Sequence, residues 1–224
     1  MRHGSAQVFS PNSPGLMKKD KPAAPPRPAR PIRLRSPQTH EVRIIGGLWK
    51  RTKLAVAEHP GLRPTPDRVR ETLFNWLGQD LTGWRCIDAF AGTGVLGFEA
   101  ASRGAKEVLL VEQDTALVAQ LKRVQTQLQA SATQIVRGDG VAALKHLDPA
   151  SMDAVFLDPP FDSVLFEAAL QAAGRAVAPS GFVYLEAPVL WTDAQLASAN
   201  LQVHRHLKAG AVHAHLLTRM ESGT

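Results

Sequence analysis

The sequence predicts an α/β fold with a doubly wound, mostly parallel, seven-stranded sheet. From Trp84 onward, short apolar runs alternate with longer segments of helical periodicity, which is the pattern of repeated βαβ units. The first apolar run leads into a glycine-rich turn over residues 92–97 with the spacing GxGxxG. The last two runs are separated by Ala209-Gly210, which indicates an antiparallel pair of strands at the C-terminal end.

The elements of this sheet follow from the local pattern. Strands are expected where apolar residues run without helical spacing, and the run at 152–157 ends at two prolines, which cannot donate to a strand ladder. Helices are expected where apolar residues recur every three or four positions. The predicted strands are residues 85–90, 105–112, 134–136, 152–157, 181–187, 201–207 and 212–219. The predicted helices are residues 95–103, 115–130, 140–147, 164–177 and 192–199.

Residues 1–40 differ in composition from the rest of the chain. They contain eight of the sixteen prolines, and residues 1–43 hold nine lysines and arginines against two acids, whereas residues 76–224 carry a net negative charge. Such a segment buries too little apolar surface to offset its ordering entropy, so we expect a disordered basic arm. It would attract a polyanion such as RNA, or remain a solvated tail. Its prolines argue against the amphipathic helix of a transit peptide.

Residues 41–80 are expected to form an extension that precedes the main domain, residues 81–224. Residues 42–51 are predicted to fold as a β-hairpin in which Gly46-Gly47 makes a two-residue turn. Basic side chains flank this turn and suit contact with nucleic acid, although such charges also protect edge strands from pairing. These basic residues are Arg43, Lys50 and Arg51.

A helix is predicted to follow the hairpin. Thr65 is a suitable N-cap, Pro66 fits the first helical position, and Asp67 complements the positive end of the helix dipole. Apolar residues at helical spacing should pack on the sheet, which leaves arginines for the polar side. These arginines either bind phosphates of a nucleic acid or serve as ordinary surface charge. The apolar residues are Val69, Leu73, Trp76 and Leu77, and the arginines are Arg63, Arg68 and Arg70.

Composition argues against several classes of protein. The single cysteine, Cys86, rules out an intrachain disulfide and disfavours a cysteine-based metal site. No apolar run reaches the roughly 18 residues needed to span a bilayer, and none resembles a secretory signal. Histidines alternate along the two C-terminal strands without a cysteine or nearby carboxylate, so we interpret them as strand residues and not as metal ligands. The default expectation is a cytoplasmic monomer without a metal.

Four carboxylates are predicted to lie at one edge of the sheet, because each ends one of four successive strands. Glu112 lies 20 residues after Gly92, where a carboxylate accepts hydrogen bonds from the ribose of a nucleotide cofactor. Asp88 precedes the glycine turn, where it would repel a pyrophosphate and favour the cationic methionyl group of S-adenosylmethionine. Asp139 could reach the adenine amino group, and the fourth carboxylate is Asp158. Each could instead cap a helix or loop, but packing gives no reason for all four.

Asp158 begins the tetrapeptide Asp158-Pro159-Pro160-Phe161. The two prolines fix the backbone directly after a buried strand. The carboxylate of Asp158 and the carbonyl of Pro159 then offer two acceptors for the two N–H groups of an exocyclic amine, while Phe161 can stack on a flat base. The alternative is a rigid turn whose aspartate caps the next helix.

These motifs resemble a known family. The segments Asp88-Ala-Phe-Ala-Gly-Thr-Gly94 and Asp158-Pro-Pro-Phe161 resemble the cofactor and amino-group motifs of class I methyltransferases, which have a Rossmann-like fold. Together with Arg43-Ile-Ile-Gly-Gly47 and the arginine-rich block over residues 62–75, they make the sequence similar to the RsmD family, from Val42 to the C-terminus. Members of that family methylate N2 of one guanine in bacterial 16S rRNA.

The resemblance implies a site and a mechanism. S-adenosylmethionine would be the cofactor, and 16S rRNA, in a partly assembled small ribosomal subunit, the partner. The tetrapeptide would hold a flipped-out guanine for direct SN2 transfer, which requires no strong base. The segment around Thr65 would close over the cofactor. The cofactor-binding residues would be Asp88, Ala89, Phe90, Gly92, Thr93, Gly94, Glu112, Gln113, Asp139, Gly140 and Thr65, and the RNA-binding residues Arg43, Lys50, Arg51, Arg63, Arg68 and Arg70.

Other functions are also compatible with these residues. The closest is methylation of another amino group, such as adenine N6 in a nucleic acid or the side chain of a protein glutamine. A nicotinamide-dependent oxidoreductase would use the same glycine turn, but it would tolerate loss of the Asp88 charge. A catalytically silent RNA-binding module would bind RNA without turnover. Transfer of a labelled methyl group to rRNA, DNA and protein would separate these functions.

Overall fold

The computed structural model describes residues 40–56, 65–161 and 164–220. These residues belong to the second of the two compact units into which the chain divides, Gln38–Thr224. The predicted basic arm, residues 1–40, lies outside the described residues apart from His40, so its role stays a prediction. Within the described ranges, no helix is both long and apolar enough to cross a membrane.

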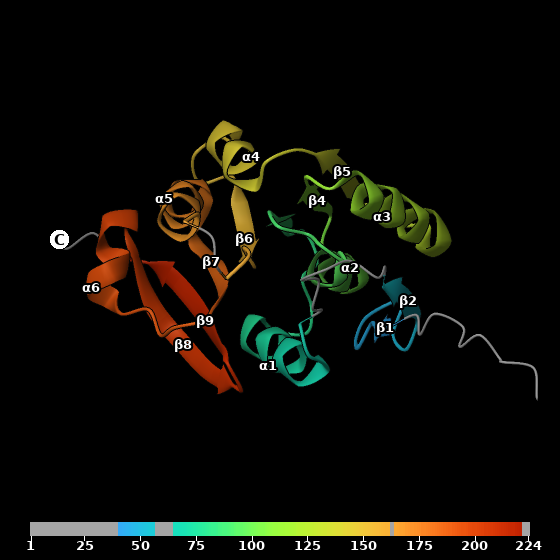
Figure 1. The fold of residues 1–224 in the computed structure, drawn as a ribbon, viewed down its shortest axis with the longest axis horizontal. Coiled ribbons are helices and arrows are strands. Elements are labelled where there is room, and N and C mark those ends of the chain that lie inside the picture. The colour runs from blue at the N-terminus through green and yellow to red at the C-terminus, as the bar shows by residue number, and fades with distance from the viewer. Residues whose placement is uncertain (1–39, 57–64, 162–163, 221–224) are drawn as a thin grey trace, which may run out of the picture. The chain divides into compact units, whose positions relative to one another are not determined.

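In the part of the chain that the structure describes, seven strands form one sheet. They are β3 (Arg85–Asp88), β4 (Glu107–Glu112), β5 (Thr133–Arg137), β6 (Met152–Leu157), β7 (Val177–Ala187), β8 (Leu201–Ala209) and β9 (Val212–Arg219). Their order is β5-β4-β3-β6-β7-β9-β8 (Figure 1). The first five run parallel, whereas β9 pairs antiparallel with β7 and β8. The order reverses at β3, so the predicted doubly wound α/β fold is confirmed.

Both faces of the central strands are buried, as is typical of a parallel sheet. Phe156 of β6 and Tyr184 of β7 belong to one apolar cluster, whereas Val155 and Leu185 belong to another. All four side chains are at most 1% exposed. Burial on two faces therefore explains the uninterrupted apolar run that marks residues 154–157 in the sequence.

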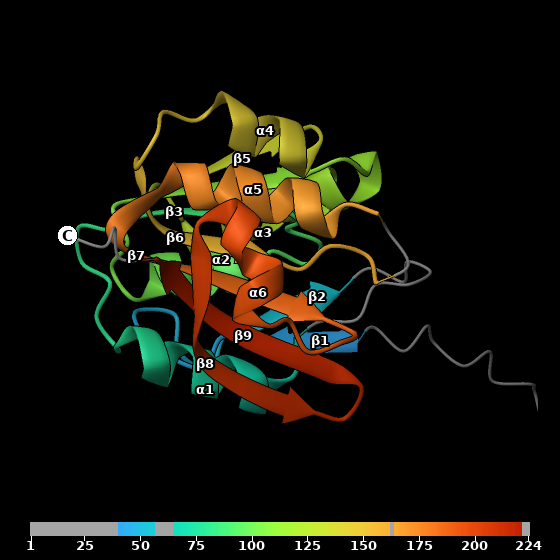
Figure 2. The ribbon, with the colours of Figure 1, turned by 90° about the vertical axis from the view of Figure 1, so that its left-hand side faces the viewer.

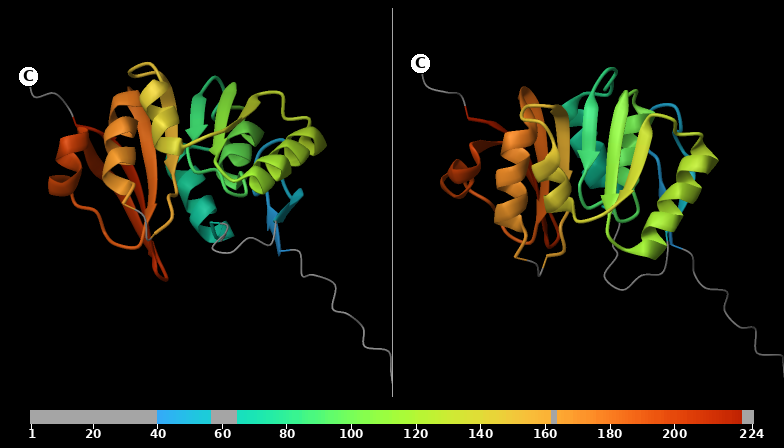
Figure 3. Two further views of the ribbon diagram at one scale, coloured as in Figure 1. Left: turned by 45° about the horizontal axis from the view of Figure 1, so that its top comes forward. Right: turned by 90° about the horizontal axis from the view of Figure 1, so that it is seen from above.

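Two groups of helices cover these two faces (Figures 2 and 3). The helices are α1 (Asp67–Leu77), α2 (Val95–Ser102), α3 (Thr115–Leu128), α4 (Gly140–His146), α5 (Phe166–Ala176) and α6 (Asp193–Leu196), followed by the 3-10 turn η1 (Ala197–Ala199). Side chains of α1, α2 and α3 join the first cluster, and those of α4, α5 and α6 join the second. Figure 2 shows α4 and α5 above the sheet and α1 below it.

Most predicted bounds lie within two residues of the observed ones, and two differ for a physical reason. Strand β7 begins at Val177 and not at residue 181, because an irregular register between Met152 and Ala154 lets pairing with β6 start sooner. The helix predicted over residues 192–199 is only four residues of α-helix followed by the 3-10 turn.

The N-terminal extension begins with a separate two-stranded antiparallel sheet. It consists of β1 (His40–Arg43) and β2 (Lys53–Val56), in which Val42 pairs with Leu54. A hairpin is therefore present, but the predicted two-residue turn at Gly46-Gly47 is wrong. The strands are joined by a longer loop, residues 44–52.

Gly46 and Gly47 instead let this loop lie directly on the end of α2. The backbone N–H of Leu48 donates to the carbonyl of Ser102 at 2.7 Å, and the Ser102 hydroxyl donates to the carbonyl of Gly46 at 2.7 Å. A Cβ atom on Gly47, whose φ is +71°, would collide with the Ser102 carbonyl. The glycine pair thus serves close approach between segments that are far apart in the sequence.

Helix α1 differs from its prediction at its start and on its buried face. Its N-cap is Pro66 and no side chain caps it, so the predicted Thr65 cap is wrong. Thr65 is itself buried. Arg70 and Phe74 join the buried face, and the Phe74 ring lies 6.3 Å from that of Phe156. The predicted core residues Val69, Leu73 and Leu77 are buried, and Trp76 is partly buried.

Candidate functional site

Four carboxylates follow four adjacent strands of the sheet. Asp88 ends β3 and Glu112 ends β4, Asp139 follows β5 by two residues, and Asp158 follows β6 directly. Their strands are consecutive neighbours in the order β5-β4-β3-β6 and run parallel, so the four carboxyl ends share one edge. The strand order reverses beside β3, and open α/β sheets bind their ligands at such a point.

Asp88 is a buried carboxylate in the middle of this edge. Its side chain is 2% exposed, and its Oδ2 accepts a hydrogen bond from the Gly97 N–H, in the first turn of α2, at 3.0 Å. Burial raises the pKa of Asp88 to about 7; the Gly97 bond opposes the rise, and the charges of Glu112 and Glu186 add to it. A positively charged ligand beside Asp88 would favour its ionised form, whereas a pyrophosphate would be repelled.

Glu112 holds the glycine-rich turn in place. Its Oε2 accepts a hydrogen bond from the Gly92 N–H at 2.9 Å, and its Oε1 accepts one from the Asp114 N–H at 2.8 Å. Gly94 has a φ of +76°, and a Cβ atom there would lie 2.7 Å from the Phe98 ring. The turn is therefore held by the Glu112 bond at Gly92 and by close packing against Phe98 at Gly94. The ribose contact of Glu112 stays a prediction, for which each oxygen has a second lone pair.

The other residues predicted to bind cofactor surround this turn. Asp139 is exposed and caps α4, because its Oδ1 accepts a hydrogen bond from the Ala142 N–H at 2.7 Å. Gly140 begins α4 so close to the carbonyl of Ala89 that a Cβ atom would strike it. Their cofactor roles stay predictions. Of the remaining predicted residues, Thr93 is buried, Phe90 is half-buried and Gln113 is exposed.

The tetrapeptide that begins at Asp158 leaves the sheet from the strand next to that of Asp88. Burial raises the pKa of Asp158 well above its ordinary value, and the charges of Glu186 and Asp88 raise it further. This carboxyl group therefore lies among like charges, and a cation or an N–H donor on a ligand would relieve the repulsion. Asp158 is half-buried, Pro159 is buried, Pro160 is exposed, and Phe161 is 40% exposed.

Glu186 adds a fifth carboxylate to this edge, and it was not predicted from the sequence. It lies one residue before the end of β7. The pairing of Leu157 with Leu185 places it beside the position where Asp158 leaves β6. The signal that could have identified it is a carboxylate at the end of an otherwise apolar strand, which is the same signal that identified Glu112.

Hydrogen bonds hold the Glu186 side chain, which is 3% exposed. Its Oε1 accepts a hydrogen bond from the Tyr184 hydroxyl at 2.8 Å, and the Thr65 side chain also bonds to it. Burial raises the pKa of Glu186, while the bonds from Thr65 and Tyr184 and the charge of Arg70 oppose the rise. Thr65 thus connects the start of α1 to the acidic edge.

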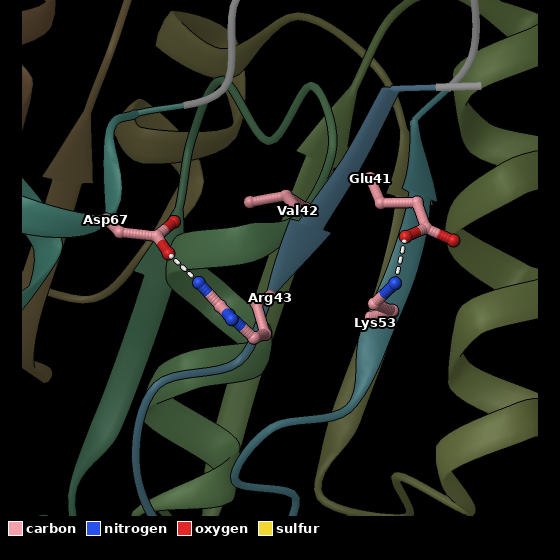
Figure 4. A pocket seen from close by; sticks show the side chains of 5 residues that line it. All are labelled: Glu41, Val42, Arg43, Lys53 and Asp67. Atoms are coloured by element: carbon pink, nitrogen blue, oxygen red, sulfur yellow. Dashed lines mark hydrogen bonds and ion pairs between the residues drawn. The ribbon is translucent and has the colours of Figure 1, made fainter. Parts of the chain in front are cut away.

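The basic residues predicted to bind RNA fall into two groups. On the extension, Arg43 pairs with Asp67 at 3.1 Å, and Lys53 pairs with Glu41 at 2.6 Å. All four residues line one pocket (Figure 4). Arg43 is more than half exposed in this pair, so a phosphate can still approach it. Arg63 lies outside the described residues. The exposed group is Arg43, Lys50, Arg51 and Arg68, and their RNA contacts stay predictions.

Arg70 differs from these exposed residues. The structure contradicts its predicted place on the polar side of α1. Its side chain is 0% exposed. The guanidinium donates to the carbonyls of Thr65 and Arg43 at 3.1 and 2.8 Å, and to Asp67 Oδ1 at 2.6 Å. It also pairs with Glu99 at 3.4 Å. Because its donors are occupied inside the protein, Arg70 is a structural residue and not an RNA contact in this conformation.

Glu99 of α2 is the centre of the network that buries Arg70. Its oxygens accept hydrogen bonds from the backbone N–H groups of Ile45 and Gly46 at 2.9 and 2.7 Å. Arg103 donates two further bonds to Oε1, at 3.1 and 2.9 Å. One fully buried carboxylate therefore ties the hairpin loop, α1 and α2 together.

Three histidines cluster on β8 and β9. His206 Nε2 lies 3.0 Å from His213 Nδ1, and the rings of His206 and His215 are 4.9 Å apart. His215 is buried and accepts a hydrogen bond from the Trp191 N–H at 3.1 Å, which links β9 to the segment after β7. Across the described ranges, no group of three or more His, Cys, Asp or Glu side chains has the arrangement of a metal site.

Known proteins resemble this chain over most of its length. The family described as conserved hypothetical protein 95 matches residues 42–218. Ribosomal RNA small subunit methyltransferase D of Escherichia coli K12 is 38% identical over 185 residues, which cover 82% of this chain and 92% of that protein. The protein of the same name from Haemophilus influenzae is 44% identical over 151 residues, covering 65% and 78% of the two chains.

A solved structure agrees with these sequence matches. The Escherichia coli protein yhhF superposes with a TM-score of 0.70 at 39% identity, over 81% of this chain and 99% of that one. The region that the family matches contains β2, the second half of β1, α1 and the whole acidic edge. The chain therefore belongs to the RsmD family, that of ribosomal RNA small subunit methyltransferase D.

Proposed function

We propose that this protein transfers a methyl group from S-adenosylmethionine to N2 of a guanine in 16S rRNA, by direct SN2 transfer to a flipped-out base. The observation that carries this proposal is the row of carboxylates at the sheet edge, above all Asp88 and Asp158. Buried or half-buried carboxylates that crowd one another favour a ligand that brings positive charge and N–H donors, and this reaction supplies both. The name of the two similar proteins from Escherichia coli and Haemophilus influenzae, ribosomal RNA small subunit methyltransferase D, supports ribosomal RNA as the substrate.

The residues present fit S-adenosylmethionine. Because the pKa of Asp88 is raised to about 7, the positive charge of the methionyl group would restore its ionised form near neutral pH. Glu112 lies against the glycine turn with lone pairs for ribose hydroxyls, and Asp139 stands exposed at the start of α4 for the adenine amino group. When bound, the cofactor supplies an electrophilic methyl group.

Asp158 and its neighbours hold the amine that receives the methyl group. The Asp158 carboxylate accepts one N–H of guanine N2, and the carbonyl of Pro159 accepts the other. The exposed Phe161 ring stacks on the base, a contact that contributes about 1–3 kcal/mol in comparable sites. Positioning of this kind can supply roughly 7–11 kcal/mol of the barrier reduction. As N2 becomes cationic, Asp158 stabilises its charge and accepts its proton.

The exposed basic residues of the extension bind the RNA backbone in this proposal. Arg43, Lys50, Arg51 and Arg68 reach solvent from the two-stranded sheet, its loop and α1. Phosphate contacts of this type orient a nucleic acid without reading its sequence. The choice of guanine therefore comes from the tetrapeptide and from the fold of the RNA. The natural substrate is the 16S rRNA of a partly assembled small ribosomal subunit, met by a monomer in the cytoplasm.

The decisive experiment maps methylated guanosines in 16S rRNA from cells with and without this protein. We expect one N2-methylguanosine to disappear without it, to return with the wild-type chain, and to stay absent with Asp158→Asn. Labelled methyl transfer to naked 16S rRNA and to small-subunit particles then identifies the form of the substrate. An unchanged set of guanine methylations in the deleted cells would show that the proposal is wrong.

Methylation of a different amino group is the second candidate, because the tetrapeptide suits any exocyclic amine. Adenine N6 and the glutamine side chain offer the same two N–H donors. The same labelled assay with DNA and with total protein tests this candidate, and transfer to either without transfer to rRNA would favour it. A nicotinamide-dependent oxidoreductase is disfavoured, because the buried Asp88 carboxyl would meet a pyrophosphate.

A further inference from the structure

Glu186 is a buried carboxylate whose presence the transfer reaction, as derived above, does not explain. It lies in β7 beside the exit of Asp158 from β6, since Phe156 pairs with Tyr184 and Leu157 with Leu185. Removing a carboxylate from water is costly, and apolar residues fill the neighbouring positions of β7. Packing alone would therefore select an apolar side chain at this position.

The side chain of Glu186 is oriented by two donors from different elements. The Tyr184 hydroxyl, buried in the same strand, donates to Oε1 at 2.8 Å. The Thr65 side chain bonds to the same carboxyl group from the residue next to the N-cap of α1. A buried carboxylate with two fixed donors has a defined direction, which is what a group needs in order to orient its neighbour.

The charged groups that face Glu186 come from three other elements. Asp158 follows β6 and Asp88 ends β3, and both interact with Glu186 through like charge. Arg70 of α1 acts in the opposite sense, but its hydrogen bonds go to Asp67, Glu99 and two carbonyls. Glu186 is therefore compensated by one charge, that of Arg70, and faces the like charges of Asp158 and Asp88.

We propose that Glu186 is a positioning residue for the methyl acceptor: from the neighbouring position in β7 it orients Asp158, and it links Asp158 through Thr65 to the start of α1. This inference rests on the proposed function of the same site. In the transfer, the methyl carbon leaves sulfur, which keeps the electron pair, and bonds to N2, which releases one proton. Asp158 accepts that proton, and the like charge of Glu186 makes acceptance more favourable.

The test replaces the charge while keeping the shape. Glu186→Gln retains an oxygen for the Tyr184 and Thr65 donors, and Glu167→Gln on the exposed side of α5 is the matched control. The first readout needs no substrate. It is the pH titration of the Asp158 carboxyl carbon by NMR, assigned through its loss in Asp158→Asn. The second readout is the pH profile of kcat/KM for methyl transfer to 16S rRNA.

We expect the Asp158 titration to move to lower pH in Glu186→Gln and to stay in place in Glu167→Gln. The acidic limb of the pH profile of kcat/KM should move to lower pH in Glu186→Gln, because loss of the like charge lowers the pKa of Asp158. kcat at pH 8 should fall, while the affinity for S-adenosylmethionine changes less than about threefold. An Asp158 titration that is the same in wild type and Glu186→Gln would overturn the inference.

Two further results keep the test decisive. Should Glu186→Gln fail to fold, Tyr184→Phe takes its place, because loss of one donor makes Glu186 less ionised and moves the Asp158 titration in the same direction by less. A wild-type protein that transfers no methyl group to rRNA would overturn the proposed function. In that case the NMR titration would still decide whether Glu186 controls Asp158.

Discussion

Two buried acidic centres lie in this protein, and their surroundings are opposite. Around Glu99, two backbone N–H groups and the guanidinium groups of Arg70 and Arg103 meet one carboxylate. Around Glu186, the Tyr184 hydroxyl and the Thr65 side chain bond to the carboxylate, and the charge of Arg70 opposes the like charges of Asp158 and Asp88. The same residue type is therefore matched by cations in one place and crowded by like charges in the other.

The difference distinguishes a structural carboxylate from carboxylates that we propose bind a ligand. A carboxylate whose bonds are all made within the protein fastens elements together and has nothing left for a ligand. Carboxylates that raise one another's pKa store an unfavourable interaction, which a cation or an N–H donor can relieve. Matched charge thus lies where the extension meets the core, and crowded like charge lies at the site that we propose for methyl transfer.

The largest expected effect is on stability, at the matched centre. Glu99→Ala leaves Arg70 and Arg103 buried without their shared partner, which typically costs about 3–5 kcal/mol of unfolding free energy. Urea denaturation measures this loss, with the exposed Glu107→Gln as control. A loss below about 1 kcal/mol would show that the network contributes little to the joint.

The next effect is on activity, at the unmatched centre. Asp158→Asn should lower kcat for methyl transfer by roughly 100-fold or more, because the carboxylate no longer stabilises the charge that develops on N2. The unfolding free energy should stay the same or rise, since one of several like charges is removed. Single-turnover kinetics and calorimetry with S-adenosylmethionine make the comparison. A variant that loses cofactor affinity and keeps the rate of the chemical step would contradict this role.

A smaller effect concerns the pH dependence of stability. The pKa of Asp88 is 3.8 in its ordinary state and about 7 in the folded protein, so the folded state retains the proton between these values. Its stabilising contribution is complete below about pH 4 and is lost as the pH rises through 7. The ligand-free protein should lose up to about 1.4 kcal/mol per pH unit from this group between pH 5 and 7. Urea midpoints across this range should show a shallower slope in Asp88→Asn.

Binding of S-adenosylmethionine should lower the pKa of Asp88. A sulfonium and an ammonium near Asp88 lower its pKa, so S-adenosylmethionine should release up to about one proton on binding near pH 7. Calorimetry in two buffers of different ionisation enthalpy counts the protons. The demethylated product, which lacks the sulfonium charge, should release fewer. Equal release by both ligands would mean that the sulfonium lies away from the acidic edge.

The smallest effect concerns the exposed Arg43–Asp67 pair. Arg43→Ala should change the unfolding free energy by less than about 1 kcal/mol, because both groups are solvated. It should lower the salt dependence of RNA binding by about one phosphate contact. Filter binding at several salt concentrations tests this, and an unchanged slope would remove Arg43 from the RNA surface.

Residues whose role follows from strand ends could be predicted, whereas those whose role depends on distant partners could not. Asp88 and Asp158 were identifiable because apolar runs show where parallel strands stop and such strands share an edge. Glu99 and Arg70 were not, since a buried charge is explained only by partners that folding brings together, here 29 residues apart. Glu186 is an intermediate case. The sequence predicted the strand that carries it, but not that its carboxylate joins the other four at the edge of the sheet.

Helix α2 connects the two acidic centres, because it bonds to a carboxylate of the sheet edge and also carries Glu99. The Gly97 N–H in its first turn donates a hydrogen bond to Asp88. Glu99 and Ser102, nearer its other end, form hydrogen bonds with the loop after β1. Eight residues of α-helix span only about 12 Å, so a displacement at one end of this short helix also displaces the other end. A hairpin grafted from another protein would therefore need the same contacts to Glu99 and Ser102. Without them it would displace α2, and with it the Gly97 N–H that bonds to Asp88.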